Sequence, residues 1–441
     1  MSYQLSILLK TETSRVVYTF RTIFLDILGF DQVHFLTDLE KFRQKDGVKI
    51  SYDIFEEGIP FLANSGNLLY ESGINQEKPI DVALENDLPY FYRHDDSRSI
   101  LPFDFAALSF WLITRYEEYQ TFEPDVHGRF SAYQSLAYKH QFLELPVIDF
   151  WAIELKHRFL NYYQNADLPQ AQEFSFQPSF DIDYAWAFKN KPFWRTSGAC
   201  FKDILKFNFS NLKERIDVLY CGMPDPYFTF SKIDKIHSSC EKPIFFWLLG
   251  DYGKFDKNTH FKNPEFRKLI AETADRYAIG IHPSYASDEK QHQAAIEKKR
   301  LEEIVKTEIV NSRQHFLKLK FPDTFANLID LGIKDEYSMG YAEMPGFRAS
   351  VSRSYHWYNL KTEQETRLRI HPFMIMDVTL NDYLKLSAAA AMAVSKQIID
   401  NCKRAGGELV IIWHNNSLCE NKQWFGWSEF YKALVDYSTK K

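Results

Sequence analysis

Apolar runs of strand length alternate with amphipathic, helix-length stretches throughout the second half of the chain. The apolar runs cover residues 173–183, 243–251, 278–285, 367–377 and 408–415, and helical spacing covers 263–277 and 287–306. Alternation of this kind predicts parallel strands covered by helices, arranged either as a barrel or as an open sheet.

The first half of the chain has a different pattern. Residues 59–70 form strand-like segments punctuated by Gly and Asn, and 104–119 has helical apolar spacing that ends in charge. We therefore expect a smaller mixed α/β domain there. A polar stretch at 164–172 marks the change in character, so the pattern predicts an N-terminal domain at 1–168 and a second domain at 172–436.

Composition narrows the possible functions. The 441 residues are 45% hydrophobic, enough for two cores, and the net charge of −6 is dispersed, which gives no basic surface for nucleic acid. The five cysteines are odd in number and form no CxxC pair, which argues against a disulfide framework and a thiolate metal site. No secretory signal and no run of 18 apolar residues is found, so we expect a cytoplasmic protein without a membrane span.

Polar residues recur where the predicted strands end or in the loops that follow. They are Asp181, Asp183, His282, Arg348, Asp377 and His414. Because an α/β barrel builds its active site at the carboxyl ends of its strands, we expect one cluster to contain them all. Asp181 and Asp183 are two residues apart on a strand, so their side chains share one face. Two negative charges so close together repel each other, so we expect a positive group between them.

The stretches FDID, IGIHPSY, GFRAS and IIWHN, in this order, resemble the polysaccharide deacetylase (NodB-homology) domain of carbohydrate esterase family 4, over about residues 172–436. Residues 101–119 and the stretch DVHGRF resemble the uncharacterised domain that precedes such deacetylases in some bacterial proteins. The resemblance implies a distorted (β/α) barrel, a divalent metal ion, preferably Zn²⁺, and a carbohydrate substrate.

The resemblance also implies a role for each matching residue. It makes Asp181 the catalytic base, Asp183 and His282 metal ligands, Arg348 the partner of Asp181, and His414 the general acid. Asp377, in MIMDVTL, is suited to holding His414 in its donor form.

Two departures from the family pattern concern the metal site and the loop after the arginine. The family places a second histidine four residues after the first, where this chain has Ala286. His315 is our candidate for the missing ligand, ahead of His292 and His260. Ala349 and Ser350 replace the Pro-Tyr pair that usually follows the arginine, so the backbone donor to the oxyanion could differ in position.

Each residue also has a structural interpretation that the sequence leaves open. Asp181 and Asp183 could cap the next helix, and Asp377 could begin the helix that follows it. Arg348 could form a structural ion pair, and His414 could be a core histidine. His127 and His371 are interpreted as turn or packing residues outside the site.

Two functions of different classes follow. One is a metal-dependent hydrolase that removes acetyl or similar acyl groups from an N- or O-acetylated carbohydrate by cleaving an amide C–N or an ester bond. The other is a deacetylase-like module that binds glycans or partner enzymes without hydrolysis, an alternative that the incomplete histidine motif keeps open. A small non-sugar amide is a further possible substrate, and the sequence does not indicate an oligomeric state.

Overall fold

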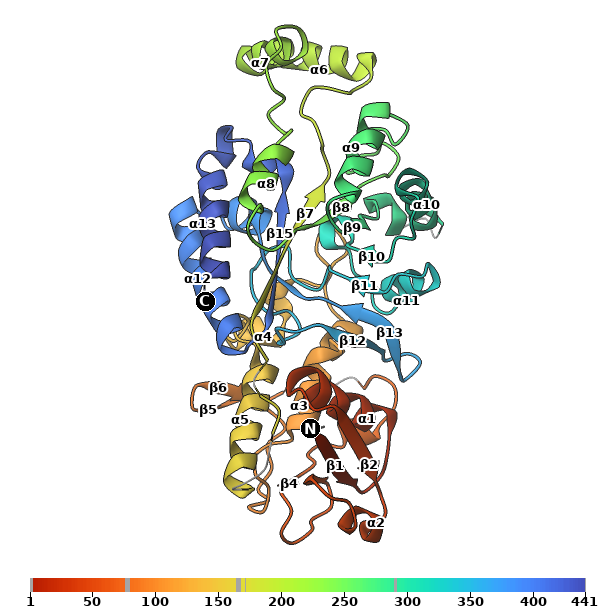
Figure 1. Ribbon diagram of the computed structural model, residues 1–441, viewed down its shortest axis with the longest axis vertical. Helices are drawn as coiled ribbons and strands as arrows, with labels where there is room; N and C mark the ends of the chain where they lie inside the picture. Colours follow the sequence, from red (N-terminus) through yellow and green to blue (C-terminus); the bar gives the residue numbers. More distant parts are fainter. Residues whose placement is uncertain (1–2, 76–79, 164–167, 171, 289–291, 441) are drawn as a thin grey trace.

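The computed structural model describes residues 3–75, 80–163, 168–170, 172–288 and 292–440. It contains a small sheet near the N-terminus and a large sheet in the second half of the chain (Figure 1). The predicted division of the chain at 164–172 lies partly outside the described residues, since 164–167 and 171 are not among them.

The small sheet is parallel and has the order β2-β1-β3-β4. Its strands are β1 (Gln4–Leu9), β2 (Gln32–Leu36), β3 (Val48–Tyr52) and β4 (Phe61–Leu62). All but the first residue of β1 are buried, as expected of a central parallel strand covered on both faces. Strands β5 (Ala83–Glu85) and β6 (Leu88–Tyr90) form a separate antiparallel pair.

The helices of this first part are α1 (Ser14–Arg21), α2 (Leu39–Arg43), α3 (Phe105–Ile113), α4 (Leu136–Lys139) and α5 (Val147–Tyr162). Helix α3 is apolar all round, which is typical of a helix enclosed by the core, and every residue in it is buried. It begins where the Asp104 carboxylate accepts a hydrogen bond from the Ala107 amide at 3.0 Å. The predicted helical spacing over 104–119 is therefore confirmed for its first half.

The large sheet has nine strands in the order β12-β13-β11-β10-β9-β8-β7-β15-β14. They are β7 (Ser175–Ile182), β8 (Ile244–Trp247), β9 (Ile279–Ile281), β10 (Asn311–Ser312), β11 (Asp335–Glu336), β12 (Tyr355–Asn359), β13 (Gln364–Ile370), β14 (Phe373–Met376) and β15 (Glu408–His414). Each pairing is parallel except that of β12 with β13. The predicted parallel strands are thus confirmed.

The predicted apolar run 367–377 is not one strand but two. Pro372 has no N–H to continue the ladder, so β13 ends before it and β14 begins after it. Six strands lie between β13 and β14 in the sheet, yet the two intervening residues can span only about 10 Å. The sheet must therefore curl so that its two sides approach each other.

Irregular backbone occupies the space where the sides of the sheet approach. The Phe373 amide donates to the Met339 carbonyl at 3.1 Å, and the Gly346 amide donates to the Met374 carbonyl at 2.9 Å. Gly340 is required here, because a Cβ at that position would lie 2.4 Å from the Phe373 ring. Within the described residues no strand pair closes the sheet, so the fold is a curled mixed α/β sheet and a closed barrel is not confirmed.

The helices of the second part cover this sheet or extend beyond it (Figure 1). They are α6 (Phe193–Leu205), α7 (Phe209–Tyr220), α8 (Phe230–Ile236), α9 (Pro264–Ala274), α10 (Gln293–Val305), α11 (Asp323–Asp330), α12 (Ala388–Arg404) and α13 (Trp427–Thr439). The helix predicted over 263–277 corresponds to α9. The helix predicted over 287–306 corresponds to α10 from Gln293 on, and residues 289–291 of that prediction lie outside the described residues. None of the helices in the described ranges is long and apolar enough to cross a membrane.

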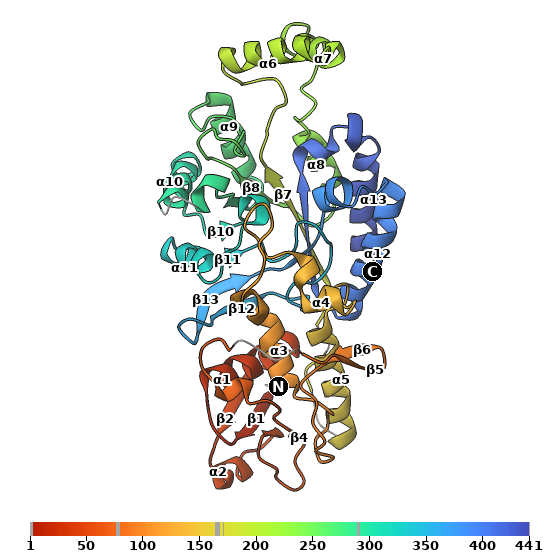
Figure 2. The ribbon, with the colours of Figure 1, turned by 180° about the vertical axis from the view of Figure 1, so that it is seen from behind.

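The two parts of the chain share one hydrophobic core cluster, which contains residues of both sheets. Polar contacts reinforce this junction. The Tyr18 hydroxyl donates to the His356 carbonyl at 2.8 Å, and the Ile148 amide donates to the Ser350 carbonyl at 3.0 Å. The segment that follows α3 also extends onto the large sheet (Figure 2), which brings part of the N-terminal half close to the strand ends.

Candidate metal and acid–base site

Strand register aligns the residues that form the candidate site. Ile182 of β7 pairs with Trp247 of β8, Trp247 pairs with Ile281 of β9, and Ile281 pairs with Ser312 of β10. The residues that follow these partners leave the sheet side by side at its carboxyl edge. Asp183, His282 and the segment after Ser312 are therefore neighbours, although they are far apart in the sequence.

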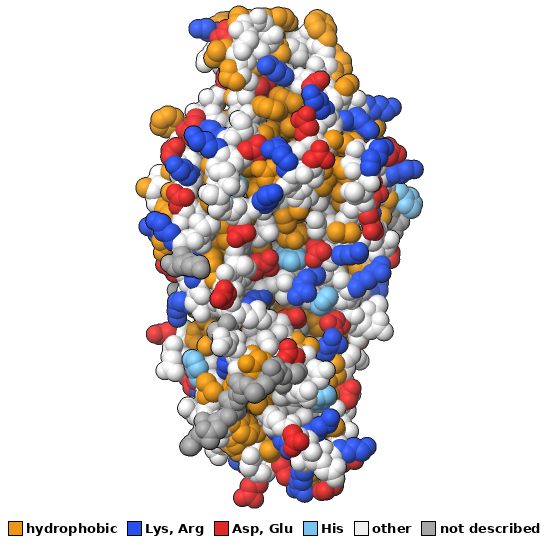
Figure 3. Space-filling view, viewed as in Figure 1, with side chains coloured by type: hydrophobic (Ala, Val, Ile, Leu, Met, Phe, Trp, Pro, Cys, Tyr) orange, Lys and Arg blue, Asp and Glu red, His pale blue; other side chains and the backbone are white. Residues whose placement is uncertain are grey.

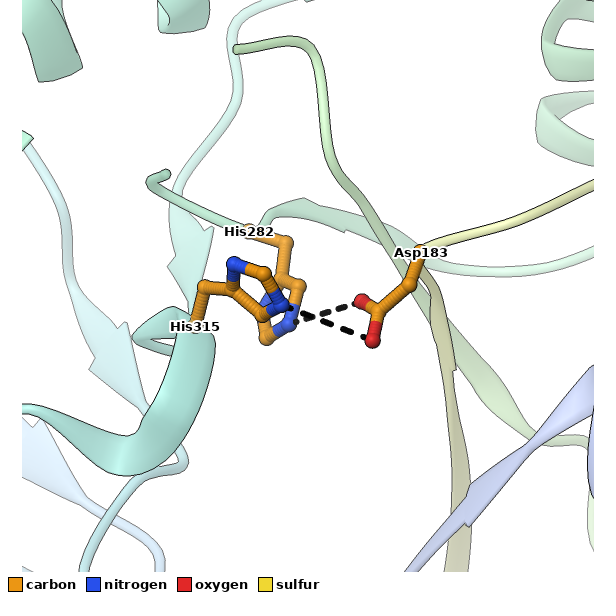
Figure 4. Close-up of side chains that lie close together, drawn as sticks. All are labelled: Asp183, His282 and His315. Carbon is orange, nitrogen blue, oxygen red and sulfur yellow. Dashed lines mark ion pairs between the residues drawn. The ribbon is translucent and has the colours of Figure 1, made fainter. Parts of the chain in front are cut away.

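Asp183, His282 and His315 converge on one point, and we call them the Asp–His–His cluster (Figure 4). The His282 Nε2 atom lies 3.3 Å from Asp183 Oδ1, and the His315 Nε2 atom lies 3.5 Å from Asp183 Oδ2. One ligand atom from each residue falls within 4.8 Å of the others. The structure thus places the predicted ligands together, whereas His260 and His292 are exposed and lie outside the cluster.

Both imidazoles of the cluster are oriented through their second nitrogen. His282 Nδ1 donates to the Arg313 carbonyl at 2.6 Å, and His315 Nδ1 lies 3.0 Å from Asp256 Oδ1. Because these partners accept hydrogen bonds, Nδ1 carries the proton and the Nε2 lone pairs face Asp183 in the neutral form. Asp256 is a site residue that the sequence did not reveal, because it lies in a loop without a recognisable motif.

The cluster requires a positive charge at its centre. Asp183 Oδ1 is buried and accepts no hydrogen bond, while the Nε2 atoms of both imidazoles face the same carboxylate. Burial lowers the pKa of His315, but Asp183 and Asp256 outweigh that effect and raise it to about 9. Burial raises the pKa of Asp183, and the two histidines reverse this and hold it well below its usual range. A divalent cation would supply the positive charge that the cluster requires. One carboxylate with two imidazoles is a donor set that suits Zn²⁺.

Asp181 is paired with Arg313, not with the predicted Arg348. The Arg313 guanidinium donates from Nη1 to Asp181 Oδ1 at 2.8 Å and from Nε to the Tyr337 carbonyl at 3.0 Å. Arg313 follows β10 directly, so the register that aligns β9 and β10 also places it beside His282. The other Asp181 oxygen, Oδ2, lies 3.8 Å from His282 Nε2, at the edge of the cluster.

The prediction that Arg348 orients Asp181 is wrong. Arg348 is buried against the N-terminal half, where its Nε donates to Glu118 Oε1 at 2.9 Å, and Arg115 binds the same oxygen at 2.7 Å. Burial raises the pKa of Glu118, but the two arginines outweigh it and lower the pKa. The sequence motif GFRAS therefore marks an ion pair between the two parts of the chain, because the N-terminal half supplies a carboxylate closer than Asp181.

We expect Arg348→Met to reduce the free energy of unfolding by about 3–5 kcal/mol, because Glu118 would stay buried with one cation fewer. Urea denaturation at neutral pH measures the effect. The matched control is Arg276→Met, which removes a half-exposed partner of Asp234 and should cost only about 0–1 kcal/mol. Unchanged stability with a selective loss of activity would restore Arg348 to the catalytic site.

His414 and Asp377 form the other flank of the cluster. His414 Nδ1 and the His414 amide lie 2.8 Å from the two Asp377 oxygens, and His414 Nε2 lies 3.8 Å from Asp183 Oδ2. Burial lowers the pKa of His414, but Asp377 and Asp183 outweigh it and raise it to about 10. His414 is thus held as a cation that can donate a proton, and Asp377 is directed to it.

A cavity of about 140 Å³ adjoins the cluster. Its lining includes the cluster, Asp181, His414 and the side chains Arg129, Gln314, Phe316, Leu317, Ala342, Met376, Val378 and Tyr383. A ligand placed there would contact the base, the acid and the candidate metal ligands together. The lining is mostly apolar away from the charged edge, as is typical of small-molecule sites.

The N-terminal half contributes Arg129 to this cavity. Arg129 donates to the Phe316 carbonyl at 2.8 Å, to the Tyr383 hydroxyl at 3.2 Å and to its own loop partner Asp125 at 2.8 Å. It therefore joins the N-terminal half to the turn that carries His315. The stretch DVHGRF was the sequence signal for this loop, but nothing in the sequence indicated its position.

The two histidines predicted to be packing residues differ in location. His127 packs on Phe316 at the edge of the cavity, with ring centroids 4.9 Å apart. His371 stacks on Tyr337 at 4.4 Å and pairs with Asp335 and Glu408. Neither belongs to the Asp–His–His cluster.

Comparisons with known proteins give partial matches. A family of unknown function, DUF7033, matches residues 5–164, and no curated protein matches the chain. Among solved structures, a protein described as a polysaccharide deacetylase from Mycobacterium smegmatis has 14% identity and a TM-score of 0.38, covering 61% of this chain and 86% of its own. A polysaccharide deacetylase from Bacillus cereus has 13% identity and a TM-score of 0.30, over 60% and 86%.

A mutant of a CE4 family pseudoenzyme with restored enzymatic activity is also similar, at 11% identity and a TM-score of 0.24. That match covers 60% of this chain and 61% of the other. Similarities this weak carry no argument about activity, so the chemistry of the site rests on the side chains themselves.

Proposed function

We propose that the protein is a metal-dependent hydrolase that removes acetyl or similar acyl groups from an N- or O-acetylated carbohydrate. One observation carries the proposal: the Asp–His–His cluster lies between two charged pairs, Asp181–Arg313 and Asp377–His414, beside a cavity. A base, an acid and an open ligand set are what hydrolysis of an amide or ester requires. The carbohydrate class of the substrate rests on the sequence resemblance.

The Asp–His–His cluster would hold the ion. Three protein ligands leave room for water and substrate, as in catalytic zinc sites. When bound, a divalent ion supplies polarisation of the acyl carbonyl and lowers the pKa of water, typically towards about 7. Asp256 and the Arg313 carbonyl keep the two imidazole rings in the orientation that ligation needs.

In this proposal Asp181 is the general base. Arg313 binds its Oδ1, which fixes the carboxylate plane and leaves Oδ2 at the edge of the cluster. A water molecule between Asp181 and the acyl carbon would give its proton to Oδ2 as it attacks. The Arg313 side chain is fully buried and lies over the Phe246 ring at 4.3 Å, so the pair is rigid.

In this proposal His414 is the general acid. Its Nδ1 is bound to Asp377, so the proton on Nε2 is directed towards the cluster and the cavity. When the tetrahedral intermediate collapses, Nε2 would donate this proton to the departing amine or alkoxide. The charged pair formed with Asp377 keeps His414 protonated in the neutral pH range, since its pKa is raised to about 10.

Metal content tests this proposal directly. We expect the purified chain, loaded with Zn²⁺, to carry about one ion, and His282→Ala and His315→Ala to lose it. Asp256→Asn should keep the ligands but weaken zinc binding by about 10–100-fold. His292→Ala is the matched control, because this exposed histidine lies outside the cluster and should leave occupancy unchanged.

Acetate release from a panel of N- and O-acetylated sugars, together with a small non-sugar amide, identifies the substrate. Full zinc occupancy in His315→Ala would contradict the ligand set. A zinc-loaded chain that binds acetylated glycans but releases no acetate would support the alternative, a deacetylase-like binding module.

A further inference from the structure

Helices α6 and α7 form a hairpin that projects from the end of the molecule opposite the small sheet (Figures 1 and 2). The two helices pack against each other and are joined through 206–208. Asp203 of α6 binds Arg215 of α7 at 3.0 Å and accepts from Asn211 at 2.8 Å. These contacts stabilise the packing of the two helices against each other, and they do not involve the apolar side chains on the outer surface of the hairpin.

The outer surface of the hairpin is unusually apolar. The exposed side chains include Phe193 at 82%, Phe207 at 80% and Tyr220 at 77% of their maximal area. Trp194, Phe201 and Leu205 are also exposed and are seven and four residues apart, which places them along one face of α6. Exposed apolar side chains gathered in this way indicate an interaction surface.

The charge of this segment is opposite to that of the whole chain. The hairpin, residues 193–220, contains five Lys or Arg and three Asp or Glu, whereas the chain has a net charge of −6. Lys202, Lys206 and Lys213 are exposed among the apolar side chains, while Asp203 is turned inward to Arg215. The upper end of the molecule in Figure 3 accordingly shows hydrophobic and basic side chains together.

We propose that the α6–α7 hairpin is a peripheral membrane anchor that inserts its aromatic side chains into the surface of an anionic bilayer. Aromatic and aliphatic side chains beside lysines are the composition of interfacial helices, where the apolar groups enter the acyl boundary and lysines bind lipid headgroups. A protein partner is disfavoured, because the centres of protein–protein interfaces are depleted of lysine. The local positive charge matches an anionic lipid surface.

Vesicle co-sedimentation of the full chain tests this anchor. We expect binding to vesicles of equal parts phosphatidylglycerol and phosphatidylcholine, weaker binding to pure phosphatidylcholine, and loss of the difference at high salt. The combined variant Phe193→Ser, Phe201→Ser and Phe207→Ser should bind at least about tenfold more weakly. The combined variant Lys202→Glu, Lys206→Glu and Lys213→Glu should lose the preference for anionic vesicles.

The matched control is Leu84→Ser with Phe425→Ser, which removes two equally exposed apolar side chains elsewhere and should leave vesicle binding unchanged. Thermal unfolding by circular dichroism confirms that each variant is folded. Absence of vesicle binding by the folded chain, or equal binding by the aromatic variant, would overturn the proposal. Self-association of the chain without vesicle binding, abolished by the same aromatic substitutions, would assign the surface to a second copy instead.

Discussion

Asp181→Asn is expected to lower turnover of an acetylated sugar by about 10²–10⁴ while leaving zinc content unchanged. The asparagine side chain has the same shape and can still bind Arg313, but it cannot accept a proton from water. Asp181 is not a member of the Asp–His–His cluster, so the ligand set would remain. The measurements are initial rates of acetate release and zinc content of the same preparation.

Asp183→Asn is the matched control for this experiment. It makes the same chemical change two residues away, but in a member of the cluster, so we expect loss of both zinc and activity. The two aspartates would exchange roles if Asp181→Asn lost its zinc and Asp183→Asn kept it. An Asp181→Asn variant with full activity would remove the general base from the mechanism.

His414→Ala should lose most activity on an amide substrate, by about 10²–10⁴, and much less on an activated aryl ester. An amine leaves poorly without a proton, whereas a phenolate departs unaided, so the acid is needed only for the first substrate. The comparison is the ratio of kcat/KM for the two substrates in wild type and variant. Equal losses on both would contradict the proton-donor role.

The pH profile of the wild-type enzyme provides an independent test of His414. The group acts in its protonated form, and its pKa is raised to about 10, chiefly by Asp377 once the opposing effect of burial is overcome. Activity on the amide should therefore persist through neutral pH and fall as pH rises through that pKa. Asp377→Asn should move the fall to lower pH, because the carboxylate that raises the pKa is lost.

The sequence predicted β7, β8, β9 and β15 of the large sheet, because apolar runs of strand length are local signals. It did not predict β12, or β10 and β11, which are only two polar residues each. The resemblance to the deacetylase family pointed to Asp183 and His282, and His315 was the candidate for the missing ligand; the structure brings these three residues together. The sequence did not predict that the run 367–377 would divide at Pro372, with six strands of the sheet between its two halves. Which strands pair is a long-range property that apolar periodicity does not contain.

By itself, then, the sequence determined the alternating α/β pattern and most of the chemical groups at the strand ends. Only the tertiary structure decided how those groups are paired. Arg313 lies 132 positions from Asp181 and still binds it, because the register of β7 to β10 brings both to one edge. Arg348 instead binds Glu118, 230 positions away. Both side chains are buried between the two parts of the chain, where an unpaired charge is costly, so each binds the nearest opposite charge. A local sequence pattern shows which chemical groups lie at the end of each strand. The partners of buried charges depend on how distant segments pack, which a local pattern does not contain.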